Sequence, residues 1–430
     1  MSRLLDMRRL LAFREFRLLW LAQSLSVIGD NIVLVALALF IIDSTGSATD
    51  LGLVLAAHAL SLVVFLLIGG VWADRLPRHR VMVVTDLTRF ALHGLLCILI
   101  FTGEVRIWQV VVIEVLFGAA EAFSRPAATG LLPQTVPEAD IQQATALTSM
   151  SNNVAEFAGP ALASVLVLGA GAGWAFALDA ATFLLSAGLL ARISPRERGG
   201  EAETTREAQP GIWDSVREGS AEIRSRTWVW ATLASFCAAL FFGLAPWYVL
   251  GPLVAKSQYG HVSVYGFVEA ALGVGTIAGS LIGLGWRPLH PMRMAMLGII
   301  VWPITSILYA TGVTLAVVVP ATAISGAGIA LFDVWWLTAL AERIPSERLS
   351  RVTAYDWMVS GGLLPIGYLL AGPLANRVGA VEVLIVGSAL AFVAFALGLL
   401  PRETRMLERL DDYQGPPIAE DSMPVAGHRY

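Results

Sequence analysis

The sequence predicts an all-α membrane protein with twelve transmembrane helices in two pseudo-symmetric six-helix bundles. Three observations carry this prediction: an apolar composition, twelve apolar stretches of spanning length, and a similarity between the two halves of the chain. Of the 430 residues, 56% are apolar and 14% are charged, and the mean hydropathy is +0.70. Soluble proteins carry about 25% charged residues. The surplus apolar surface is therefore expected to face lipid.

The expected spans are apolar runs separated by charged residues, proline or glycine clusters. In order they are 18–42, 51–72, 82–101, 108–124, 147–168, 174–192, 228–250, 263–285, 294–311, 315–338, 353–375 and 380–400. A helix of about 20 residues crosses the hydrocarbon core and closes its backbone hydrogen bonds internally. The strands of a barrel would instead alternate in polarity over about ten residues. The arginine-rich start precedes a full-length span without a cleavage site, so we expect an anchor and not a signal sequence.

The distribution of basic side chains predicts the orientation. If the N-terminus is cytoplasmic, 25 of the 29 Arg and Lys residues fall on inside loops and tails and 3 on outside loops, and Arg89 lies within a span. Cytoplasmic loops carry such an excess. We therefore expect both termini in the cytoplasm. A missed helix would invert every later loop, so this split supports twelve spans.

The chain is expected to divide into two bundles, 1–193 and 228–401, joined by a cytoplasmic linker with an amphipathic helix at 194–227. A disordered cytoplasmic tail is expected at 402–430. At an offset of 208 residues, the segments 131–150 and 339–358 resemble each other, and each lies between the fourth and fifth span of its half. Two related bundles are typical of transporters that bind substrate where the halves meet.

A charged loop motif follows the second span. The run 69–80, GGVWADRLPRHR, resembles the loop signature of the major facilitator superfamily, in which a glycine, an Asp-Arg pair and a basic cluster connect helices two and three. The motif residues are Gly70, Asp74, Arg75, Arg78 and Arg80. The glycine permits close helix approach, the aspartate accepts hydrogen bonds, and the arginines hold the turn on the cytoplasmic side. Pro77 stands where the family usually has glycine. A generic basic loop is the alternative.

Three stretches resemble the exporter branch that includes macrolide and siderophore efflux proteins. They are Ile28-Gly29-Asp30, Thr85-Asp86-Leu87-Thr88-Arg89 and Phe157-Ala158-Gly159-Pro160. The last is similar to the Gly-Pro signature of antiporters, so Gly159 and Pro160 are expected to serve helix packing. The resemblance covers roughly residues 15–400. Glu114 departs from it, because much of the superfamily has near this position an arginine associated with proton coupling.

Ionisable side chains within the spans are the candidate functional residues, because a carboxylate at bilayer depth costs about 2.5–3.5 kcal/mol. Asp30 lies near the middle of the first span, where transporter sites occur, and is the expected proton carrier. A structural, hydrogen-bonded acid is the alternative. Asp179 and Glu269 lie toward the outer ends of their spans and are expected to be wetted or to contact an outer vestibule. Glu156 follows two asparagines by one turn, and either lines the cavity or holds two helices together.

Other charged residues are expected to form pairs. Asp86 and Arg89, three residues apart on one helix face, should satisfy each other. The repeat offset carries Arg125 onto Asp333, which predicts an ion pair between the halves that closes the inner gate when the pore faces outward. Glu121, one turn before Arg125, is a competing partner.

These features favour a secondary active transporter that exports a lipophilic or amphiphilic small molecule by alternating access, in exchange for protons. The resemblance and Asp30 imply the proton coupling. A proton-linked importer or facilitator is the alternative within the class. A membrane-embedded enzyme and a non-transporting receptor are alternatives outside it. An enzyme would need grouped catalytic or metal-binding side chains, whereas the six histidines are scattered along the sequence without a paired motif.

The expected partners are the small-molecule substrate, protons and the lipid bilayer. The net charge of −4 argues against nucleic-acid binding. We expect no cofactor, no metal and a monomer, and no Walker-type phosphate loop is present in the sequence. The preference for Arg over Lys is typical of a GC-rich bacterial source, so the expected location is a bacterial cytoplasmic membrane.

Overall fold

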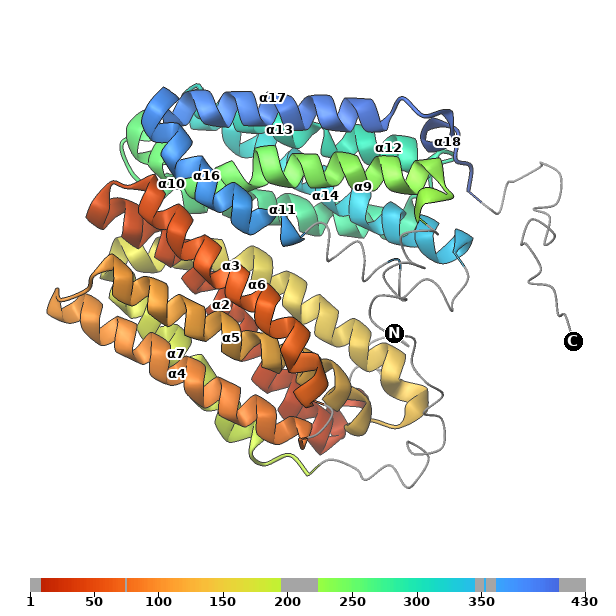
Figure 1. The fold of residues 1–430 in the computed structure, drawn as a ribbon. Coiled ribbons are helices and arrows are strands. Elements are labelled where there is room, and N and C mark those ends of the chain that lie inside the picture. Colours follow the sequence, from red (N-terminus) through yellow and green to blue (C-terminus); the bar gives the residue numbers. More distant parts are fainter. Residues whose placement is uncertain (1–8, 74–75, 195–222, 345–351, 353–360, 410–430) are drawn as a thin grey trace, which may run out of the picture.

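The structure is a computed structural model that describes residues 9–73, 76–194, 223–344, 352 and 361–409. Every regular element in these ranges is helical. Figure 1 shows two helical bundles side by side, one from each half of the chain. This arrangement confirms the predicted all-α class with two bundles.

The first bundle contains six long helices. They are α2 (Arg14–Thr45), α3 (Ala48–Ala73), α4 (Arg78–Thr102), α5 (Ile107–Leu131), α6 (Ile141–Ala170) and α7 (Ala172–Leu190). Two short 3-10 turns, η1 (Leu132–Gln134) and η2 (Glu138–Asp140), connect α5 to α6. Helix α2 packs against α6 and α7, α3 packs against α5, and α4 packs against α5 and α7.

The second bundle contains crossings that are interrupted more often. Its elements are α9 (Thr227–Ala239), the π turn η4 (Leu240–Leu244), α10 (Ala245–Tyr259), α11 (Val264–Gly285), α12 (Pro291–Ile299), α13 (Val301–Ala310), α14 (Leu315–Arg343), α16 (Leu364–Val378) and α17 (Ala380–Gly398). The short helix α18 (Arg402–Arg405) follows them. The π turn joins α9 to α10 in one crossing, and Ile300 joins α12 to α13 in another.

The packing partners repeat between the two halves. The first and sixth crossings contact each other in both bundles, as α2 with α7 and as α9 with α17. The second and fourth crossings do so as well, as α3 with α5 and as α11 with α14. The described helices therefore repeat a pattern of packing between the two halves.

Among the described residues, eleven helices are long and apolar enough to cross a membrane. The described part of the eleventh expected span is α16, and residues 353–360 of that span lie outside the described residues. Most of the expected linker, 195–222, and most of the expected tail, 410–430, also lie outside them. The order and positions of the described helices follow the predicted spans.

The two ends of the molecule differ in charge and in contact between the bundles. One end carries Arg14, Arg78, Arg125 and Arg343, and is called here the arginine-rich end. In Figure 1 the ribbons of the bundles approach each other at the opposite end and separate toward the arginine-rich end.

Contacts between the bundles lie toward the opposite end. Lys256 Nζ lies 3.1 Å from Asp43 Oδ1, and Asn376 Nδ2 donates a 3.0 Å hydrogen bond to Thr49 Oγ1. A methyl group on Gly372 would overlap the backbone of Thr49, so α16 and α3 touch almost backbone to backbone. Helices α6 and α11 also contact each other, and α10 contacts α2 and α3.

Candidate functional site

A small cavity of about 100 Å³ lies where the two halves meet. Its wall is mainly apolar but includes two carboxylates and two tyrosines. The lining residues are Asn31, Leu34, Val35, Ala38, Leu55, Glu156, Pro160, Tyr248, Tyr265, Glu269, Leu272 and Gly273. They come from α2, α3 and α6 of the first bundle and from α10 and α11 of the second. A mainly apolar cavity with a few convergent polar groups is typical of a small-molecule site.

Each half contributes one of the carboxylates, Glu156 from α6 and Glu269 from α11. Glu269 is largely buried, and Trp247 Nε1 donates a 2.5 Å hydrogen bond to its Oε1. Glu156 is an exposed side chain in the wall of this cavity, which is one of the two positions expected for it.

The Gly-Pro pair of α6 lies at the same place. A Cβ on Gly159 would lie 2.5 Å from Asn31 Cβ, so the glycine lets α6 approach α2 closely. Pro160 lines the cavity itself. The Gly-Pro stretch therefore shapes the wall between the first and fifth crossings.

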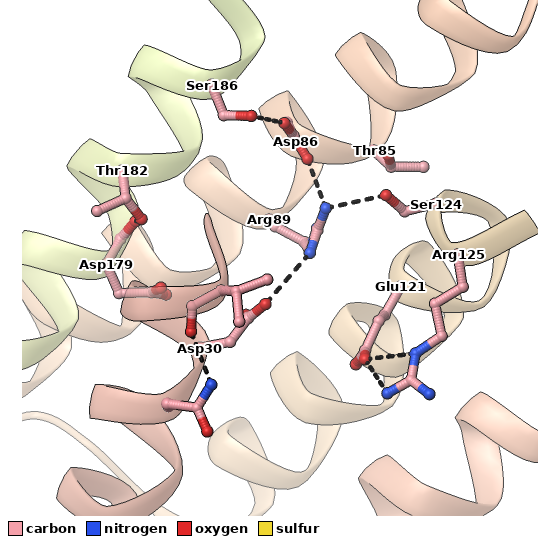
Figure 2. A network of polar contacts seen from close by, with 12 residues as sticks. Asp30, Thr85, Asp86, Arg89, Glu121, Ser124, Arg125, Asp179, Thr182 and Ser186 are labelled. Carbon is pink, nitrogen blue, oxygen red and sulfur yellow. Dashed lines mark hydrogen bonds and ion pairs between the residues drawn. The ribbon is translucent and has the colours of Figure 1, made fainter. Parts of the chain in front are cut away.

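A buried arginine organises the polar interior of the first bundle (Figure 2). Arg89 Nη2 donates hydrogen bonds to Asp86 Oδ1 at 2.5 Å and to Ser124 Oγ at 3.2 Å, and Nη1 lies 3.8 Å from Asp30 Oδ2. Ser186 Oγ donates to the second oxygen of Asp86 at 2.5 Å. The Asp86–Arg89 pair is thus part of a larger network that joins α2, α4, α5 and α7.

Asp30 turns toward Arg89, while its neighbour Asn31 lines the cavity. The Asp30 side chain is 31% exposed, and its Oδ1 is buried with no hydrogen-bond partner in the structure. An acid with one ion-paired and one unsatisfied oxygen has an open position for a proton. This geometry is compatible with the carrier role expected for Asp30.

Asp179 corrects one prediction. Its side chain is 0% exposed, and its Oδ2 forms a hydrogen bond with His93 Nδ1 of α4. It is therefore neither wetted nor part of an outer vestibule. Sequence position gave its depth along α7, but it did not reveal that this face of α7 packs against α2 and α4.

Two histidines lie close together in a way that the sequence did not reveal. Although they are scattered in the sequence, His58 and His93 approach the same carboxylate, Glu114 of α5. His58 Nδ1 lies 3.0 Å from Glu114 Oε2, and His93 Nε2 lies 3.5 Å from Glu114 Oε1. His58 Nε2 also lies 3.2 Å from Glu121 Oε2. The sequence signal for these residues was the presence of ionisable side chains within spans.

Arg125 is bound to the competing partner in this structure. Its Nη2 and Nε donate hydrogen bonds to Glu121 Oε1 at 2.7 Å and 2.9 Å. Asp333 is exposed on α14, and both Arg125 and Asp333 lie toward the arginine-rich end, where the ribbons are apart. The pair between the halves stays a prediction for a conformation closed at that end.

The charged loop motif is only partly described. Gly70 lies near the end of α3, whereas Asp74 and Arg75 lie outside the described residues. Arg78 Nη1 donates a 2.5 Å hydrogen bond to the carbonyl oxygen of Gly130 at the end of α5. Arg80 is exposed. The described part of the motif therefore ties the start of α4 to the end of α5.

Within the described parts of the chain, no group of three or more His, Cys, Asp and Glu side chains is arranged to hold a metal ion. The clustered histidines and acids of the first bundle instead contact one another.

Comparison with protein families and curated proteins gives consistent matches. The profile of the Major Facilitator Superfamily matches residues 19–363. Macrolide efflux protein A of Streptococcus pyogenes is 24% identical over 377 residues, which cover 85% of this chain and 90% of that protein. The uncharacterized MFS-type transporter YvqJ of Bacillus subtilis is 24% identical over 392 residues, which cover 90% of this chain and 92% of that protein.

Solved structures share the fold at low sequence identity. The nucleoside transporter NupG gives a TM-score of 0.68 at 13% identity, covering 89% of this chain and 98% of that chain. A bacterial homologue of the human lysosomal transporter Spinster, in an inward-facing and unoccupied conformation, gives a TM-score of 0.64 at 16% identity. That match covers 91% of this chain and 98% of the homologue.

Proposed function

This chain belongs to the major facilitator superfamily of transporters, and we propose that it exports a lipophilic or amphiphilic small molecule in exchange for protons. The observation that carries this proposal is the cavity between the halves, whose apolar wall holds Glu156 from one bundle and Glu269 from the other. An apolar wall suits a lipophilic substrate. The carboxylate from each half would let both bundles contact the same bound molecule.

The position of this cavity supports transport by alternating access. The bundles contact each other through α3 with α16 near the opposite end and through α6 with α11 beside the cavity. If the arginine-rich end is cytoplasmic, as the basic loops favour, this conformation is open toward the cytoplasm. Rocking the bundles about the cavity would expose the same residues to the other side.

Asp30 is the proposed proton carrier. It combines an ion pair to Arg89 with a buried, unsatisfied oxygen, and it adjoins Asn31 in the cavity wall. Protonation of Asp30 would remove its charge and weaken its attraction to Arg89. Movement of α2, which carries both Asp30 and Asn31, would then link proton binding to the shape of the cavity.

Export is favoured over import by one comparison. Macrolide efflux protein A, which matches over most of both chains, is an efflux protein by name. An importer or facilitator with the same fold would show the opposite direction or no dependence on the proton gradient.

The test is the accumulation of ethidium, a fluorescent cation, and of erythromycin, a macrolide, in cells that express the full chain. We expect lower accumulation than in cells with an empty vector, and loss of this difference when a protonophore is added. Asp30→Asn should also remove the difference. Glu104→Gln is the matched control, because Glu104 is exposed in the loop between α4 and α5. Equal accumulation with and without the wild-type chain, for both compounds, would refute the proposed export.

A further inference from the structure

Carboxyl and imidazole groups alternate through the first bundle. In spatial order they are Asp179 of α7, His93 of α4, Glu114 of α5, His58 of α3 and Glu121 of α5. Each histidine lies between two acids and presents one ring nitrogen to each. His58 makes the tighter bridge, with nitrogen to oxygen distances of 3.0 Å to Glu114 and 3.2 Å to Glu121.

This alternation requires protons beyond those of neutral imidazoles. A neutral imidazole has one N–H group, so it can donate to only one of the two carboxylates that flank it. The second contact is favourable only if the ring is doubly protonated or if one of the acids is protonated. His58, whose two ring nitrogens both lie within 3.2 Å of a carboxylate oxygen, therefore calls for one additional proton.

The charge balance of the whole network also favours additional protons. The network contains five carboxyl groups and two guanidinium groups. The carboxyl groups are those of Asp30, Asp86, Glu114, Glu121 and Asp179, and the guanidinium groups are those of Arg89 and Arg125. With all acids ionised and neutral imidazoles, negative charges exceed positive charges by three. Unbalanced charge is costly in a membrane interior. The excess negative charge of the network therefore favours the binding of protons.

The series is closed at one end and accessible at the other. Asp179 is 0% exposed, and His93 stacks on Phe117 with ring centroids 4.0 Å apart. His58 is 26% exposed and Arg125, bound to Glu121, is 57% exposed. From Glu114 to Arg125 the series advances about 16 Å along α5 at the rise of an α-helix, toward the arginine-rich end.

We propose that Asp179, His93, Glu114, His58 and Glu121 form a proton relay between the interior of the first bundle and the arginine-rich end. The proposal rests on the proton exchange proposed above and gives it a path. When a proton passes inward through His58, Nε2 accepts it from Glu121 while the Nδ1 proton moves to Glu114. Only N–H and O–H bonds form and break. The ring is left with its proton on Nε2, and reorientation of the ring, which presents this N–H group to Glu114, restores the starting arrangement before the next transfer.

The weakest step of the relay lies between His93 and Glu114. His93 Nε2 and Glu114 Oε1 are 3.5 Å apart, and neither atom has a hydrogen-bond partner in the structure. A shift of a few tenths of an ångström between α4 and α5 would close this contact. The relay can therefore be interrupted or completed by a small movement of helices.

The first experiment separates proton movement from substrate movement in proteoliposomes that contain the full-length protein. Ethidium transport is measured in two modes, one driven by a pH gradient and one as exchange of labelled for unlabelled ethidium without a gradient. We expect His58→Gln and Glu121→Gln to slow the gradient-driven mode by about 100-fold, the lower range of a positioned proton-transfer group. Exchange should persist, since it requires no net proton transfer. The control is His261→Gln, which alters an exposed histidine and should change neither mode.

The second experiment does not depend on a substrate. After a rapid pH change, the infrared carbonyl stretch of protonated carboxyl groups reports how fast buried acids of the purified protein gain protons. We expect His58→Gln to slow this signal by about 100-fold relative to wild type and to His261→Gln. Equal rates of the infrared signal in all three proteins would overturn the relay. It would also be overturned if His58→Gln lost gradient-driven transport and exchange equally while its infrared rate was unchanged. Absence of any wild-type ethidium transport would refute the proposed function for this cation, and the infrared rates would then decide the relay alone.

Discussion

Arg89 is the residue on which the interior of the first bundle depends most. Its guanidinium faces the oxygens of Asp86, Ser124 and Asp30, and it lies 4.2 Å from the ring centroid of Phe183. The planar, permanently charged group suits several acceptors and an aromatic face at once. A lysine would supply the charge without this geometry.

Removal of the Arg89 charge should destabilise the protein strongly. Arg89→Gln leaves Asp86 and Asp30 without their buried cation, and the expected cost is about 3–5 kcal/mol. The measurement is thermal unfolding of the purified protein in detergent. The control is Arg192→Gln, which alters an exposed arginine after α7. An unchanged unfolding temperature for Arg89→Gln would mean that the network contributes little to stability.

At the scale of helices, glycine allows the closest approach in the second bundle. Helix α11 carries glycine at every fourth position, at Gly275, Gly279 and Gly283, and all three face α14. A methyl group on Gly275 would overlap the carbonyl oxygen of Ala323. Small residues at this spacing are typical of helices that pack closely in membranes.

Gly275→Ala should therefore separate α11 from α14 and lower stability. The clash is with backbone, which cannot rotate away, and overpacking of this kind costs about 1–3 kcal/mol. Gly94→Ala is the matched control, since a methyl group at Gly94 of α4 meets no atom within 4 Å. Thermal unfolding of the two variants should show a loss only for Gly275→Ala, and equal curves would contradict the packing account.

The positions of the helices along the sequence were more predictable than the side of each helix that contacts its neighbours. Length and composition predicted the helices because a membrane span needs an apolar run of fixed length. The Asp86–Arg89 pair was predictable because its spacing lies within one helix. Asp179 was misassigned, and the clustering of His58 with Glu114 was missed. Such contacts depend on how each helix is rotated toward its neighbours, and His58 and Glu114 are 56 residues apart in the sequence.

For the whole molecule, we propose that the contact between α3 and α16 serves as a gate at the opposite end. Cysteines at Thr49 and Asn376, whose side chains are hydrogen bonded at 3.0 Å, should form a disulfide that locks this end shut. Cys97 and Cys237 are replaced first by alanine, so that only the new pair can react. We expect oxidation to stop ethidium transport and reduction to restore it. Full transport by the cross-linked protein would show that this contact need not open.

The other end should close through charges that are apart in this conformation. Arg125→Asp and Asp333→Arg should each impair transport, and the double reversal should recover part of it, because the proposed pair between the halves is restored with opposite polarity. Arg125 is hydrogen bonded to Glu121 in this conformation. Glu121→Gln, combined with these reversals, tests whether Arg125 exchanges Glu121 for Asp333 as its partner. Absence of rescue in the double variant would argue against the pair.

In the proposed transport cycle, substrate and protons move in opposite directions through one cavity with alternating access. Simultaneous recording of ethidium and of internal pH in proteoliposomes with the purified protein tests this directly. We expect an imposed pH gradient to drive ethidium uphill while protons flow the other way, and Asp30→Asn to abolish both flows together. Ethidium movement without any proton movement would contradict it.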